Sequence, residues 1–175
     1  MKQTIRTAGW VAIIVFAATL KPAAAQSLKA EMLKDWGNLK GRISKLAAEM
    51  PADKFDFKPT PAQQSFGERV MHVAGANVKF LGTAGAKATV PTFDPKAMGK
   101  DGAIKALEAS FDYGTAILNE QTDQTMVQVI EAPFIGESTR ARLYTFLIGH
   151  TWDIYGQLAV YLRLSGGVPP ASQRP

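Results

Sequence analysis

Residues 27–51 read SLKAEMLKDWGNLKGRISKLAAEMP and decide the fold. Large apolar residues recur in this stretch at spacings of three and four, which places them on one face of an α-helix. They are Leu28, Met32, Trp36, Leu39, Ile43, Leu46 and Met50. Ser27 is a suitable N-cap, and Pro51 stops the pattern. The stretch therefore predicts a long amphipathic helix with Trp36 on its apolar face.

Three further segments have the same helical period. The sequence Ser65-Phe66-Gly67-Glu68 has the pattern of a capping box and predicts a second helix that runs to about Thr83. A third helix is expected from about Asp101, with an apolar stripe along one face. That stripe consists of Ile104, Leu107, Phe111, Gly114 and Leu118. A fourth helix is expected over residues 138–164, where two glycines and two prolines follow.

The segments between these helices are rich in proline and glycine and read as loops. Within residues 122–136, the apolar run Met126–Ile130 predicts a short extended segment before Pro133. Four amphipathic helices around one core indicate an all-α protein, a four-helix bundle. The length of 175 residues suits a single domain, which we expect to span residues 26–175.

Residues 1–25 have the pattern of a secretory signal peptide. Lys2 and Arg6 form a basic start, Ala8–Leu20 is mostly apolar, and three alanines at 23–25 form a small-residue cleavage site. The alternative is a membrane anchor, but the apolar run is shorter than the roughly 20 residues needed to span a bilayer. We therefore expect a mature chain that begins at Gln26 and is periplasmic or secreted, with no membrane attachment after cleavage.

The net charge of +5 depends partly on this leader. Removing Lys2, Arg6 and Lys21 with the leader leaves 17 basic and 15 acidic residues, a net charge of +2. The mature chain therefore gives no electrostatic argument for a nucleic-acid partner. The chain also has no cysteine, which excludes disulfides, thiolate metal ligands and a cysteine nucleophile.

The two histidines of the chain, His72 and His150, both fall inside expected helices. On the fourth helix, His150 is predicted in the middle of the apolar stripe, and Asp153 at its edge. A histidine aimed into a core needs a polar partner or a metal ion, and a core histidine bonded to a side chain or water is the alternative to a ligand. The helical period places His72 just outside the apolar face of the second helix and predicts a half-exposed surface residue.

The order and spacing of several short motifs resemble the DinB family over about residues 28–173. The resemblance rests on Trp36, on the run Met50–Thr60 (MPADKFDFKPT), and on the capping sequence followed by His72 and Asn77. It continues through His150, residues 155–158 (YGQL), residues 161–163 (YLR) and the glycine- and proline-rich end at 166–172.

The resemblance implies a four-helix bundle of up-down-down-up order and, often, a homodimer. Many members of the family hold a divalent metal with three histidines, one on the second helix and a His-x-x-x-His pair on the fourth. His72 matches the first of these positions and His150 the second, so the two rings are expected to face each other across the bundle.

The third ligand position, one turn after His150, is occupied by Ile154, whose side chain cannot bind a metal. Asp153 is the substitute that the sequence offers, because two histidines and one carboxylate form a known open site for divalent ions. Asp153 is alternatively an acceptor for an imidazole N–H. The candidate metal ligands are therefore His72, His150 and Asp153, with zinc, nickel or iron as the ion.

Two functions remain open from the sequence. The first is a metal-dependent hydrolase or transferase acting on a small-molecule substrate, in which the ion activates a nucleophile and polarises a carbonyl. The second is a non-catalytic exported bundle that has lost the metal site and binds a small molecule or a partner.

Overall fold

The computed structural model describes residues 27–93 and 99–173. Four long helices account for most of these residues, together with a short helix and a two-stranded hairpin. The elements are α1 (Leu28–Glu49), α2 (Phe66–Leu81), α3 (Lys100–Asn119), α4 (Asp123–Met126), β1 (Val129–Ala132), β2 (Gly136–Thr139) and α5 (Arg140–Leu164), with 3₁₀ turns at Ala52–Lys54 and Pro170–Ser172. The predicted all-α four-helix bundle is confirmed, with a small hairpin added.

Helix α1 has the boundaries that its sequence predicts. The Ser27 side chain caps it by accepting a hydrogen bond from the Ala30 amide. Its apolar stripe is buried from Met32 to Met50, and Leu28 is partly buried at the end of the helix. Trp36, at the centre of the stripe, is 0% exposed.

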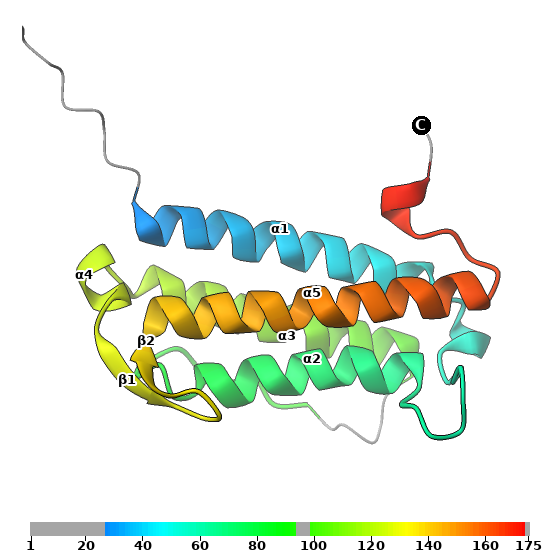
Figure 1. The fold of residues 1–175 in the computed structure, drawn as a ribbon, viewed down its shortest axis with the longest axis horizontal. Helices are drawn as coiled ribbons and strands as arrows, with labels where there is room; N and C mark the ends of the chain where they lie inside the picture. Colours follow the sequence, from blue (N-terminus) through cyan, green and yellow to red (C-terminus); the bar gives the residue numbers. More distant parts are fainter. Residues whose placement is uncertain (1–26, 94–98, 174–175) are drawn as a thin grey trace, which may run out of the picture.

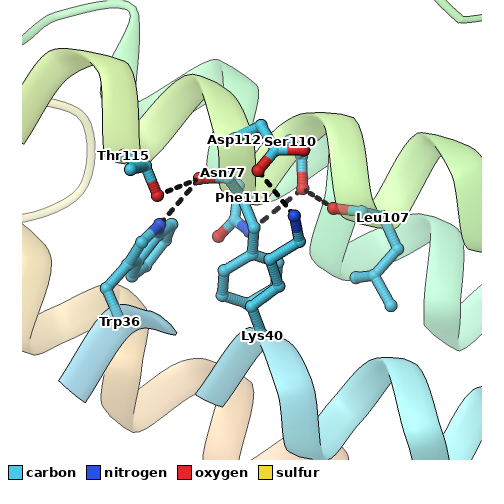
Figure 2. A network of polar contacts seen from close by, with 8 residues as sticks. All are labelled: Trp36, Lys40, Asn77, Leu107, Ser110, Phe111, Asp112 and Thr115. Atoms are coloured by element: carbon cyan, nitrogen blue, oxygen red, sulfur yellow. Dashed lines mark hydrogen bonds and ion pairs between the residues drawn. The ribbon is translucent and has the colours of Figure 1, made fainter. Parts of the chain in front are cut away.

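Polar contacts join α1 to α3 at the level of Trp36 (Figure 2). The indole Nε1 of Trp36 donates a 2.8 Å hydrogen bond to the carbonyl of Phe111, and the two rings lie 4.6 Å apart. At the edge of the same contact, Lys40 pairs with Asp112 at 2.5 Å. Because the indole N–H has an acceptor inside the core, Trp36 is buried without an unsatisfied donor.

The capping box that opens α2 is formed as predicted. Ser65 Oγ accepts from the Glu68 amide at 3.1 Å, and the Glu68 carboxylate accepts from the Ser65 amide at 2.6 Å. Glu68 also pairs with Lys58 at 3.2 Å. These contacts fix the first turn of α2, and therefore the angular position of every residue that follows on that helix.

The four long helices run up, down, down and up, as Figure 1 shows. Helices α2 and α3 lie side by side and parallel, so α3 begins at the same end of the bundle as α2. Helix α5 packs against α1 and α2, and α3 packs against α1 and α2. This order places the middle of α2 beside the middle of α5, and the two helices run antiparallel.

The segment between α3 and α5 differs in part from its prediction. Met126 belongs to α4, which Thr122 caps, and Val127 follows that helix, so neither is in a strand. The extended structure begins at Val129 and pairs with β2 in an antiparallel hairpin. Thr122 and Thr125 form a reciprocal cap in which a threonine replaces the usual Glu or Gln, and this substitution hides the short helix in the sequence.

The predicted signal peptide, residues 1–25, lies outside the described residues. None of the helices that the structure describes is both long enough and apolar enough to cross a membrane.

Candidate functional site

His72 lies in the middle of α2, on the side of that helix that turns toward α5. Its side chain is exposed, which agrees with the margin position that the periodicity of α2 predicts. The capping box at Ser65 sets this orientation, because it fixes the start of α2 less than two turns before His72.

His150 lies on α5 at the margin of the buried face, and not at its centre. Its side chain is partly buried, whereas that of the next residue, Thr151, is 0% exposed. The prediction of a central core position is therefore wrong. Apolar residues also lie on the exposed side of α5, among them Trp152 and Val160. The sequence pattern therefore does not show clearly which face of this helix is buried.

The structure brings the two histidines together. Their ring centroids are 5.0 Å apart, and the ring planes meet at 70°. The pair lies where α2 and α5 pack against each other, with His72 exposed and His150 partly buried. The predicted convergence of the His72 and His150 rings is thus confirmed.

The surroundings of His150 disfavour its protonated form. Burial is the largest cause that lowers its pKa, and electrostatic interactions with His72 and Arg69 lower the pKa further. The Asp153 carboxylate acts in the opposite direction. A neutral imidazole is the form that binds a metal ion or accepts a proton.

Neither imidazole makes a hydrogen bond to another described residue. The Nε2 atom of His150 is buried and has no partner within the described part of the chain. A buried ring nitrogen without a partner is costly unless a water molecule, ion or ligand satisfies it. Two imidazoles at this separation fit a metal ion held by two nitrogen ligands, since each metal–nitrogen bond is about 2.0–2.1 Å long.

A third protein ligand is not assembled beside them. Asp153 is exposed, and its carboxylate accepts a 2.9 Å hydrogen bond from the amide of Gln157. Ile154 is 2% exposed and belongs to the core. Over residues 27–93 and 99–173 the structure holds no group of three His, Asp or Glu side chains arranged to bind a metal. The role of Asp153 as a ligand stays a prediction.

Two features of the site were not singled out from the sequence. Arg69 lies one turn before His72 on the same face of α2, and its Nε atom is buried without a hydrogen-bond partner among the described residues. Phe146, one turn before His150, lies nearly parallel to that ring at 6.5 Å. Both residues lie a helical turn from a histidine, so the spacing alone was the available signal.

A groove of about 450 Å³ continues from His72 along α2. Its walls are His72, Gly75, Ala76, Lys79, Phe80 and Phe134. Gly75 and Ala76 carry little or no side chain, which leaves the space open. Phe134, from the turn between β1 and β2, is 84% exposed, and its ring is tilted by 37° against that of Phe80 at a centroid distance of 5.6 Å.

The chain belongs to the DinB family, whose model matches residues 23–175. A DinB-like protein from Bacillus cereus ATCC 10987 has the same fold, with a TM-score of 0.68 and 19% identity over 83% of this chain and 97% of its own. A DinB-like protein from Bacillus subtilis gives a TM-score of 0.63 and 18% identity over 82% of this chain and 99% of its own. The described architecture is therefore the DinB-like bundle that the motifs indicate.

A third similar structure is YfiT from Bacillus subtilis, described as a probable metal-dependent hydrolase with an unusual four-helix bundle topology. It has a TM-score of 0.61 and 15% identity, covering 79% of this chain and 87% of its own. Among proteins with curated descriptions, none matches this chain.

Proposed function

We propose that this protein is a metal-dependent enzyme, a hydrolase or transferase of a small-molecule substrate, with its centre at the His72–His150 pair. The observation that carries the proposal is the 5.0 Å distance between the two ring centroids together with the buried Nε2 of His150, which has no hydrogen-bond partner among the described residues. The family and the description of YfiT as a probable metal-dependent hydrolase support the same kind of activity.

The chain's own residues would hold zinc, nickel or iron through the two imidazoles. Asp153 is the proposed third ligand, reached if its side chain leaves Gln157. A bound ion would supply an acidic water and a polarised substrate carbonyl. Phe146, one turn earlier on α5, lies nearly parallel to the His150 ring at a centroid distance of 6.5 Å and borders the proposed centre with an apolar side chain.

A second candidate is favoured by Ile154. Because this residue is buried where the family's third histidine would stand, the chain is also consistent with a bundle that binds a small molecule without catalysis. In that case the histidines and the groove beside them serve only to bind.

Metal content of the purified mature protein separates the two candidates. We expect substoichiometric zinc or nickel in the wild type, with a dissociation constant of about 1 μM or weaker. The Ile154→His variant is expected to bind zinc at least about ten-fold more tightly, because a third ligand on a rigid helix adds binding energy without ordering new chain.

Val160→His is the matched control, since it adds a histidine to an exposed position on the same helix. Thermal unfolding of Ile154→His in metal-free buffer checks that the buried substitution leaves the bundle folded. If the folded Ile154→His variant binds zinc no better than Val160→His, the metal-dependent enzyme is contradicted and the non-catalytic binding bundle is favoured.

Export is part of the proposal. The leader pattern at residues 1–25 supports a periplasmic or secreted protein. A homodimer, which the family resemblance implies, remains a prediction for a solution measurement of mass.

A further inference from the structure

We infer that the ligand of this site is a small organic acid with an apolar body, whose carboxylate is bound by Arg69 and whose body lies in the groove between His72 and Phe134. The inference rests on the proposed function, since it names the class of substrate for the same site. The supporting observations concern charge, shape and position.

The charge of Arg69 has no anionic partner in the described structure. The nearest acid along α2, Glu68, is occupied by the capping box and by Lys58. Asp153 lies on α5, and the ion pairs among the described residues include none between it and Arg69. The Arg69 guanidinium therefore has a buried N–H without a partner among the described residues, and it lies one turn before His72 on α2, close enough to His150 to act on it electrostatically.

An arginine in this position suits a carboxylate. The guanidinium presents a planar set of donors that matches two carboxylate oxygens, and partial burial strengthens the contact relative to water. A neutral ligand would leave both the Nε–H of Arg69 and the Nε2 of His150 without partners. Binding an oxyanion satisfies the first and brings the rest of the ligand beside the second.

The shape and lining of the groove indicate the size and apolar character of the ligand's body. His72, Gly75, Ala76 and Lys79 line the groove from α2, and Arg69 lies one turn before His72 on the same face of that helix. Phe80 and Phe134 make most of its surface apolar. A volume of about 450 Å³ accommodates a small molecule with an aryl or alkyl body.

The far end of the groove carries a second positive charge. The Lys79 ammonium lies 5.1 Å from the centre of the Phe134 ring, which holds that exposed ring over the groove. The groove therefore has the Lys79 ammonium at one end, and Arg69 lies one helical turn before His72 beyond the other end. This arrangement opposes cationic ligands and favours anionic ones.

The test is an NMR titration of the mature protein with 3-phenylpropanoate and with its neutral amide. Protein stripped on a chelating resin and protein with added zinc are titrated separately. We expect the acid to bind the stripped wild type about ten-fold more tightly than the amide. Shifted amides should lie on α2 between Arg69 and Phe80.

Two variants and one control locate the binding. Arg69→Gln should reduce acid binding to the level of the amide and leave amide binding unchanged. Gly75→Leu should weaken both ligands by filling the groove, and it meets no atom within 4 Å at its Cβ. Arg42→Gln removes an exposed arginine of α1 that lies over Trp152, and it should change neither affinity.

Equal binding of acid and amide to the wild type would overturn the inference, as would unchanged acid binding by Arg69→Gln. These failures are distinct from failure of the proposed function. If the protein prefers the acid but binds no metal, the acid site is supported and the metal centre is contradicted. If the protein binds metal but does not prefer the acid, the metal centre is supported and the acid site is contradicted.

Discussion

The indole of Trp36 lies directly against the backbone of Gly114. A Cβ atom placed on Gly114 would come within 2.6 Å of Cζ2 of Trp36, closer than any real side chain can approach. The carbonyl of Gly114 also accepts a 2.7 Å hydrogen bond from the Tyr144 hydroxyl. The absence of a side chain at this position therefore lets α1, α3 and α5 meet in one aromatic cluster.

Gly114→Ala is expected to destabilise the protein by about 1–3 kcal/mol, since the extra methyl must displace a ring with no free space around it. Gly156→Ala is the matched control. It lies on a helix where a Cβ meets nothing within 4 Å, and it should stabilise by about 0.5–1 kcal/mol through helix propensity. Urea unfolding of both variants measures the difference. A neutral Gly114→Ala would show that the indole can move aside.

Trp36→Ala should cost about 3–5 kcal/mol, because it removes the largest fully buried side chain of the described core. Trp36→Phe retains most of the apolar contact and loses the hydrogen bond to Phe111. Since Thr115 also donates to that carbonyl at 3.1 Å, the Phe variant should lose only about 0.5–1.5 kcal/mol. Chemical denaturation of both variants measures how much free energy of unfolding each one loses. Equal losses for Trp36→Ala and Trp36→Phe would contradict this account of the indole N–H.

The lowered pKa of His150 predicts acid sensitivity. When the folded-state pKa lies below the unfolded value of about 6.5, the unfolded chain takes up the proton first as pH falls. The contribution of His150 to stability is therefore present above pH 6.5 and is lost as pH falls through the folded pKa. Melting temperature in metal-free buffer should drop over this range, and His150→Gln should reduce the drop. An identical pH profile for His150→Gln would contradict the prediction.

Asp153→Asn distinguishes the two roles open to the acid. As a direct ligand, its loss should nearly abolish metal binding. As an acceptor beside an imidazole, its loss should weaken binding about 10–100-fold. In either case the variant should lower the pKa of His150 further, because Asp153 raises it in the wild type. Calorimetry with zinc and an NMR titration of the imidazole provide the two measurements.

The mature chain should begin at Gln26. Intact mass of the protein recovered from the medium or periplasm tests this, because cleavage after the alanines at 23–25 fixes one mass. Full-length protein retained in the membrane fraction would instead support the anchor.

Local signals in the sequence predicted the fold well. The N-cap at Ser27 and the capping box at Ser65 fixed two helix starts, because each depends only on residues three apart. The hairpin was harder. Val129 and Ile130 have the apolar character of a strand, but their partners in β2 include Ser138 and Thr139, which carry no strand pattern of their own.

The site was predictable only in part. The family resemblance placed His72 and His150 together, and the structure has them in contact. Periodicity misplaced His150, because a buried threonine at 151 occupies the core position beside it. Helical spacing places Arg69 one turn before His72, but the groove also depends on the position of Phe134 beside α2, which no local pattern encodes.

The up-down-down-up order has a consequence for how this chain folds. Helix α1 is made first, yet the helices that cover it, α3 and α5, come much later in the sequence. The acceptor of the Trp36 indole is 75 residues away. Such long-range closure slows folding relative to bundles whose successive helices pair directly. The apolar stripe of α1 therefore stays uncovered until α3 and α5 have packed against it, and until then it is exposed to aggregation with other chains.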